Sequence, residues 1–214
     1  RLGAAMAGVE DPVDVVIKPV LNFPAFGQRR FIARQLQGRG QQGLAQLFEK
    51  SQRGSTEAKQ SKMLTRAQLI AYQLGIARMF WYEFQAPESD ELDPESHFGI
   101  LHRDLSPKPA YLAYKTLIAQ RPAGSVPLEK AWKSADGAFF HPQWKRPDGQ
   151  AAGAVWAYRK SGVYKLTFSV KDLPLTSHLG APVGVQWNGN TCILPLSDEP
   201  VFFTGGTLES VAET

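Results

Sequence analysis

The residue types best suited to chemistry are Trp81 and Glu83, which stand two positions apart in an aromatic run. An indole ring can cover the apolar C–H face of a sugar, and a carboxylate can accept hydrogen bonds from the sugar hydroxyls. Side chains two positions apart on a strand face the same side. The pair therefore indicates a sugar-binding surface. In the alternative interpretation Trp81 is a core residue and Glu83 is a hydrogen-bonded acid at a strand end, because large aromatic residues are buried on average.

The other reactive residue types form no recognisable centre. The only cysteine is Cys192, which excludes an intrachain disulfide and a multi-cysteine zinc site. The histidines lack metal-ligand spacing, and Gly-x-Ser-x-Gly, P-loop and dinucleotide-binding motifs do not occur. The acidic residues between positions 88 and 95 lack the spacing of a calcium loop. We therefore expect no metal ion and no other cofactor.

The net charge of +4 at pH 7 comes from one part of the chain. Residues 1–54 carry eight Lys or Arg and four Asp or Glu, whereas residues 55–214 carry sixteen of each. The basic residues are not interleaved with aromatic residues and belong to no DNA-reading motif. We expect a solvated face and no nucleic-acid partner. No apolar run approaches the ~18 residues of a membrane span, so we expect no membrane span either.

The elements that must position Trp81 and Glu83 are predicted by the residues around them. Apolar residues at helical spacing predict a helix that ends at Gly75. Residues 76–84 are apolar and aromatic, which predicts a strand covered on both faces. A long loop then leads to a second helix, with Pro109 in its first turn. This order is typical of α/β folds, whose ligand sites form beyond the carboxyl ends of the strands.

The last third of the chain shows a different pattern. Short apolar runs separated by turn residues predict strands at residues 138–140, 154–158, 163–168, 182–186, 192–196 and 200–203. Repeated short strands without helices between them predict an antiparallel β-sandwich. Residues 121–125 show no periodicity and mark the expected domain boundary. The predicted domains are therefore residues 1–125 and residues 126–214.

Three motifs occur in a characteristic order: Phe80-Trp81-Tyr82, His97-Phe98-Gly99 and Lys108-Pro109-Ala110-Tyr111. Together they resemble the end of the barrel of a clan A glycoside hydrolase, of the family 39 or family 5 kind. In those enzymes the eighth strand ends in a Trp-Tyr-like pair at the sugar-binding mouth. The last third of the chain is similar to the small β-sandwich beside such barrels. The resemblance spans residues 56–206.

The resemblance implies a fold class of α/β plus all-β, with the last units of a TIM-type (β/α)8 barrel followed by a small antiparallel β-sandwich. It also implies retaining hydrolysis by two carboxylates, a general acid and a nucleophile. Glu49 is the candidate nucleophile from its distance to the following helix, although the usual Thr before it and Gly after it are missing. No Asn-Glu pair, the usual signature of the acid, occurs in the sequence. In the alternative interpretation Glu49 lies on the solvated face of a helix over residues 44–50.

Residues 1–127 amount to about half of the ~250 residues of a typical complete barrel. The barrel is therefore expected to be incomplete in this chain, with an upstream segment completing it. We expect the C-terminal portion of a retaining glycoside hydrolase with a carbohydrate substrate, and this substrate class favours a secreted or periplasmic location. Two alternatives stay open. One is a non-catalytic carbohydrate-binding or structural protein derived from this fold, and the other is a small α+β interaction protein with chance similarity.

Overall fold

The computed structural model describes residues 56–76, 78–86, 94–158 and 160–214. The chain divides into two compact units. The larger unit, Glu57–Met79 and Pro107–Thr214, holds the helices α4 and α5 and the strands β1 to β10. The smaller unit is described at residues 56, 80–86 and 94–106, and it holds the 3-10 helix η1 (Pro94–His97).

Helix α4 (Glu57–Gln73) ends as the sequence predicts. Gly75 has φ +70°, a left-handed conformation that glycine adopts without strain. Its N–H donates to the carbonyl of Tyr72 at 3.1 Å, and the N–H of Ile76 donates to the carbonyl of Ala71 at 3.0 Å. These two hydrogen bonds form a Schellman motif and satisfy carbonyls of the last turn.

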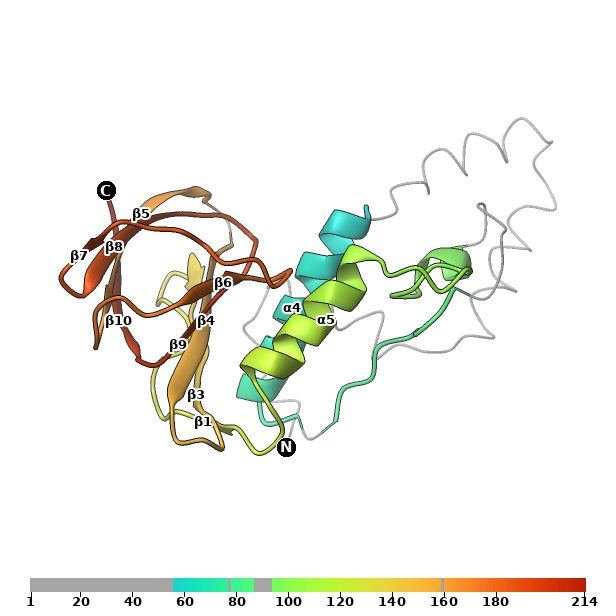
Figure 1. Cartoon of the computed structure of the whole chain (residues 1–214), viewed down its shortest axis with the longest axis horizontal. Helices are drawn as coiled ribbons and strands as arrows, with labels where there is room; N and C mark the ends of the chain where they lie inside the picture. The colour runs from blue at the N-terminus through green and yellow to red at the C-terminus, as the bar shows by residue number, and fades with distance from the viewer. Residues whose placement is uncertain (1–55, 77, 87–93, 159) are drawn as a thin grey trace. The chain divides into compact units, whose positions relative to one another are not determined.

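Helix α5 (Pro109–Gln120) begins with the proline that predicts its start, since the first turn needs no N–H there. It lies beside α4, and both helices run in the same direction (Figure 1). The buried residues of α5 follow helical spacing: Ala110, Ala113, Thr116 and Leu117. A helix with such a stripe must pack it against other elements of the unit.

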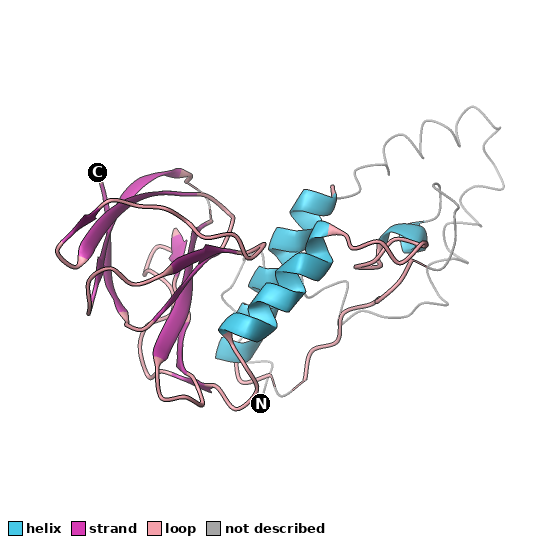
Figure 2. Cartoon of the chain, in the orientation of Figure 1, coloured by secondary structure: helices cyan, strands magenta, loops and turns pink. Residues whose placement is uncertain are grey.

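Residues 76–84 do not form the predicted strand, and Figure 2 draws their described part as loop. The nearest pairing is an isolated parallel bridge between Gln85 and Leu101. A strand needs a regular ladder of backbone hydrogen bonds to a neighbouring strand. Among the described residues, the backbones of 83 and 84 bond to the loop at residues 98–101, and no strand pairs with residues 76–84. Three aromatic side chains are consequently exposed instead of covered, at 76%, 47% and 63%: Phe80, Tyr82 and Phe84.

The residues after α5 form two sheets in which every strand pair is antiparallel. The six-stranded sheet has the order β1 (Val126–Pro127), β3 (Gln143–Lys145), β4 (Ala151–Ala157), β9 (Val201–Thr204) and β6 (Leu175–Ser177), with β2 (Phe139–Phe140) paired to β4. The four-stranded sheet has the order β10 (Leu208–Glu213), β5 (Gly162–Phe168), β8 (Thr191–Leu196) and β7 (Trp187–Asn188). The predicted mixture of helices with antiparallel sheets is confirmed.

The two sheets share one hydrophobic core. Buried and less buried residues alternate along β5 and β8, so each of these strands turns one face to the core. The core residues come from both sheets and from the turn after β5: Val155, Ala157, Tyr164, Leu166, Phe168, Leu173, Leu175, Cys192, Leu194, Leu196, Val201, Phe203 and Leu208.

The opposite face of the six-stranded sheet is also buried. Trp144 and Phe202 lie on this face, edge to face with ring centroids 6.5 Å apart, and both are inaccessible to solvent. The indole N–H of Trp144 donates to the carbonyl of Gln120, the last residue of α5, at 3.2 Å. The helices α4 and α5 therefore cover this face, and the larger unit has the layers sheet, sheet and helix pair (Figure 1).

Five of the six predicted strands overlap an observed strand, and the prediction at residues 182–186 is wrong. Pro182 makes only an isolated bridge to Thr176, since a proline has no N–H to donate to a ladder. The short strands β1, β3, β6 and β7 and the polar strand β10 were not predicted. They contain too few alternating apolar residues to give a signal.

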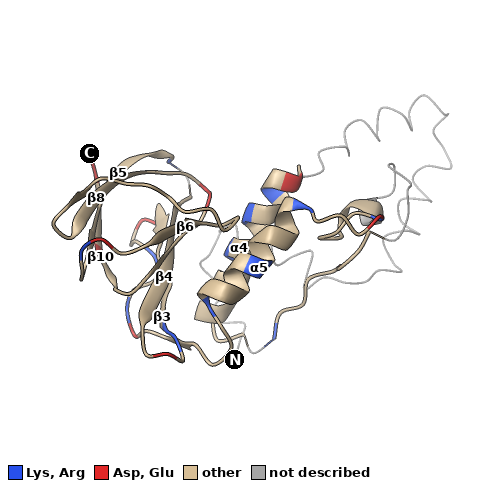
Figure 3. Ribbon diagram, viewed as in Figure 1, with Lys and Arg blue, Asp and Glu red and all other residues tan. Residues whose placement is uncertain are grey.

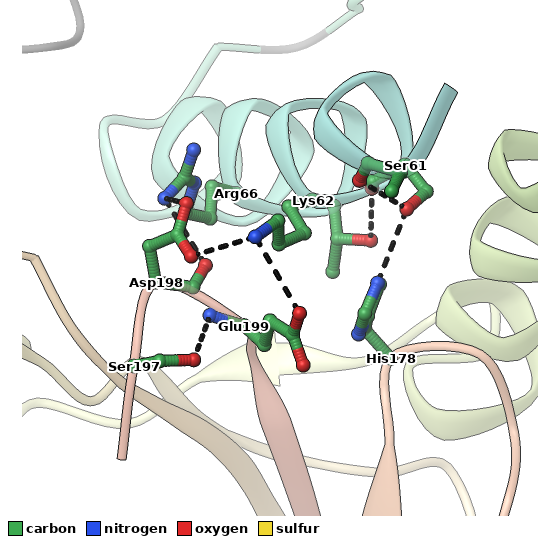
Figure 4. Close-up of polar contacts among 9 residues, drawn as sticks. Ser61, Lys62, Arg66, His178, Ser197, Asp198 and Glu199 are labelled. Atoms are coloured by element: carbon green, nitrogen blue, oxygen red, sulfur yellow. Dashed lines mark hydrogen bonds and ion pairs between the residues drawn. The ribbon is translucent and has the colours of Figure 1, made fainter. Parts of the chain in front are cut away.

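Charged side chains join α4 to the turn between β8 and β9. Figure 3 shows basic residues in blue on α4. Lys62 and Arg66, which belong to α4, both contact Asp198 (Figure 4). Lys62 Nζ lies 2.8 Å from Asp198 Oδ1, and Arg66 Nη1 lies 3.1 Å from Oδ2. Burial alone would raise the pKa of Asp198, but the Lys62 hydrogen bond and the Arg66 charge hold this pKa below its usual value.

Replacing Asp198→Asn should lower the free energy of unfolding by about 1 kcal/mol, because the ion pairs are partly exposed and water screens them. Urea unfolding at neutral pH measures the change. The matched control is Glu213→Gln, which removes the same charge from an exposed pair with Lys160 and should change nothing measurable. An equal loss in both variants would contradict a special role for Asp198.

Candidate functional site

Trp81 lies in the extended segment that follows α4, and its ring is half-buried. Its indole N–H donates to the carbonyl of Phe98 at 3.2 Å. The ring of the next residue, Tyr82, meets the Phe98 ring edge to face, with centroids 6.3 Å apart. Two consecutive residues of the extended segment therefore contact one residue of the loop that follows η1.

Glu83 is half-buried like Trp81, whereas its neighbours Tyr82 and Phe84 are exposed. The peptide bond between Tyr82 and Glu83 is cis. The Glu83 N–H donates to the Phe98 carbonyl at 3.4 Å, and the Glu83 carbonyl accepts from the Ile100 N–H at 3.1 Å. The same loop thus fixes the backbone of Glu83 and the side chain of Trp81.

Glu49 lies outside the described residues, and so do the acidic positions 88–93. The predicted nucleophile therefore stays a prediction. Within the part of the chain that the structure describes, no group of three or more His, Cys, Asp or Glu side chains is placed to hold a metal ion. In the same part, no helix is long and apolar enough to span a membrane.

The buried thiol is unsuited to nucleophilic chemistry. Cys192 lies in the core between the sheets, and burial raises the pKa of its thiol to about 11. The thiolate is the reactive form of cysteine, so this side chain is inert at neutral pH.

A second polar cluster brings together Ser61, His178 and two acids, residue types that also occur in serine hydrolases (Figure 4). Ser61 is fully buried, and its Oγ donates to the carbonyl of Ala58 at 2.8 Å. Its other contact, at 3.1 Å, is His178 Nε2, and the direction of this hydrogen bond follows the tautomer of the imidazole ring. A nucleophilic serine must reach its substrate, whereas the Ser61 hydroxyl is enclosed by the protein. We conclude that this contact holds α4 to the sheets.

The sequence predicted neither His178 nor Asp198 as partners of α4. Asp198 is separated from Lys62 by 136 positions, and His178 is separated from Ser61 by 117. One signal was present in the sequence. Lys62 and Arg66 are four positions apart and share a helix face, so they form a basic pair to which an acid can bind.

Stability should depend on pH through His178. Burial lowers the pKa of His178 most strongly, and the Glu199 carboxylate opposes this shift in part. The unfolded chain therefore binds the proton more readily, at its ordinary pKa near 6.5. The stabilisation is fully present above pH ~6.5 and is lost as the pH falls from there toward the lowered pKa.

Urea unfolding between pH 7.5 and pH 5.5 tests this dependence, and His178→Gln should reduce the slope. His141→Gln should remove a separate part of the pH dependence of stability, because burial also lowers the pKa of His141. A His178→Gln variant with the parent's full slope would contradict the assignment.

No protein-family model and no curated protein sequence matches the chain. Among solved structures, a family 39 glycoside hydrolase from the gut symbiont Bacteroides cellulosilyticus WH2 is similar, with a TM-score of 0.59 and 21% identity. The match covers 72% of this chain and 31% of that chain. The catalytic domain of the GH30 xylanase C from Talaromyces cellulolyticus gives a TM-score of 0.46 at 12% identity, covering 73% of this chain and 36% of that one.

The match to the family 39 structure is a likeness of fold, and this chain spans about a third of that protein's length. Partial coverage of this kind fits a C-terminal portion of the larger fold. The resemblance read from the sequence is therefore confirmed at the level of fold, because the fold of this chain is similar to part of a family 39 glycoside hydrolase.

Proposed function

We propose that this chain is the C-terminal portion of a glycoside hydrolase that cleaves a polysaccharide or glycoside by retaining, two-carboxylate chemistry. The observation that carries the proposal is the fold match to a family 39 glycoside hydrolase over 72% of the chain. In this proposal residues 1–125 belong to the barrel, an upstream segment completes it, and residues 126–214 form the accessory β-sandwich.

Within the proposed site, Trp81 covers the apolar face of a sugar ring and Glu83 accepts hydrogen bonds from its hydroxyls. Both residues are half-buried, so each remains partly accessible to solvent while neighbouring residues restrict its movement. Phe98 binds the indole edge of Trp81 through its carbonyl. An aromatic platform and a neighbouring acid are the usual means by which a protein holds a polar ligand with an apolar face.

The chemistry itself requires two carboxylates about 5–5.5 Å apart. Glu49 is the proposed nucleophile, and the general acid belongs to the upstream segment because the chain contains no Asn-Glu pair. The nucleophile attacks the anomeric carbon while the acid protonates the leaving oxygen. Water then hydrolyses the covalent glycosyl-enzyme, with the same acid now acting as base.

The second candidate function is carbohydrate binding without hydrolysis. The absence of the Asn-Glu pair and of the Thr and Gly around Glu49 favours it. The two functions differ in one result, because a binding protein retains sugars on the Trp81 surface and releases no reducing ends from any glycoside.

A polypeptide that includes the upstream segment should hydrolyse a panel of plant and microbial glycans, and proton NMR should show initial retention of the anomeric configuration. Glu49→Gln should lower kcat by orders of magnitude, because it removes the covalent step. Activity within a few-fold of the parent would exclude Glu49 as the nucleophile. Binding of glycans without any hydrolysis would establish the second function.

Trp81→Ala should raise KM by about 10-fold, equivalent to about 1.4 kcal/mol of lost binding. Glu83→Gln keeps the shape and removes the charge, and it should have an effect of similar size because hydrogen bonds to charged groups are the stronger ones. Glu213→Gln, on β10, is the control for charge alone and should leave KM unchanged. Unchanged kinetics in both site variants would remove the platform from the proposal.

A further inference from the structure

The loop that follows η1 runs along the extended segment containing Trp81 and Glu83. Its residues 98–101 exchange backbone hydrogen bonds with residues 83–86. Leu101 donates to the carbonyl of Phe84 at 2.9 Å, and Ala86 donates to the carbonyl of Leu101 at 3.2 Å. Residues 98–101 thus brace the extended segment through their backbone, and we call them the brace.

Gly99 lies where the two backbones leave no room for a side chain. A Cβ atom at Gly99 would lie 2.3 Å from the nitrogen of Ala86, 2.7 Å from the carbonyl carbon of Gln85 and 2.9 Å from the oxygen of Leu101. All three are backbone atoms, so no side-chain rotation relieves the overlap. Any larger residue must push the brace away from the extended segment.

The brace reaches both proposed site residues through one atom. The carbonyl oxygen of Phe98 accepts the indole N–H of Trp81 at 3.2 Å and the backbone N–H of Glu83 at 3.4 Å. Phe98 directly precedes Gly99 in the chain, so its carbonyl position depends on the close approach that Gly99 permits. A shift of the brace therefore moves the acceptor that fixes the ring.

We infer that Gly99 is a positioning residue. Because it has no side chain, the Phe98 carbonyl can lie where it accepts both the Trp81 indole N–H and the Glu83 backbone N–H, and it thereby fixes the Trp81 ring relative to Glu83. Gly99 touches no ligand in this arrangement and acts through Phe98. The inference that this placement of Trp81 and Glu83 serves to bind a sugar rests on the proposed function. The placement itself does not rest on it, so one experiment tests the placement and another tests sugar binding.

The first test observes the indole N–H of Trp81 in a 15N-labelled sample of this chain. The chain has five tryptophans, and the signal lost in Trp81→Phe identifies the one that matters. Gly99→Ala should shift this signal and raise its hydrogen-exchange rate at least about tenfold, leaving the other indole signals in place. The matched control is Gly184→Ala, since a Cβ at Gly184 meets nothing within 4 Å.

An unshifted Trp81 signal in Gly99→Ala would overturn the inference. If Gly99→Ala does not fold, the parent decides: the hydrogen bond to Phe98 requires slower exchange of the Trp81 indole N–H than of free tryptophan. Exchange as fast as in the free amino acid would also overturn it.

The second test measures binding of cellohexaose, an oligosaccharide whose pyranose rings have flat C–H faces. Gly99→Ala should raise Kd about tenfold with Gly184→Ala unchanged, while urea unfolding shows whether global stability differs. Equal Kd values for a folded Gly99→Ala and the parent would refute the positioning role. A parent that fails to bind cellohexaose counts against the proposed function alone, and the indole signal still decides the role of Gly99.

Discussion

The requirement to bury both faces of the six-stranded sheet determines the arrangement of the larger unit. Its strand β4 has buried side chains on both sides, so each face needs a cover. The four-stranded sheet covers one face, and α4 and α5 cover the other. Uncovering Trp144 and Phe202 would cost about 1.5–3 kcal/mol for each side chain. This exceeds the contribution of the partly exposed ion pairs at Asp198, which therefore orient α4 more than they hold it.

The sequence is sufficient to predict those helices whose first or last residue is determined by a single residue type. Gly75 ends α4 by a backbone conformation, and Pro109 starts α5 because it lacks an N–H. The strands β4, β5, β8 and β9 were predicted from short apolar runs between turn residues, and their apolar side chains fill the shared core. Residues 76–84 show the limit of this approach. Their composition fits a buried strand, but a strand also needs a paired neighbour, and composition does not say whether one is present.

The candidate site was predicted in part for the same reason. Trp81 and Glu83 were identified by type and spacing, and both occupy half-buried positions beside one loop. The role of Gly99 could not be predicted from the sequence, because a close approach of two backbones depends on which segments pair in space. The ion pairs between α4 and Asp198 were also predicted only in part. Lys62 and Arg66 had a recognisable helical spacing, but their partner comes from a turn more than a hundred positions away.

The burial of Cys192 has a practical consequence for work on this protein. A thiol reagent needs both access and a thiolate, and the native fold denies it both. The chain therefore behaves toward maleimides as if it contained no cysteine. A single Val170→Cys replacement in the exposed turn after β5 would create one accessible thiol for a spin label or a fluorophore, without removal of the native residue from the core.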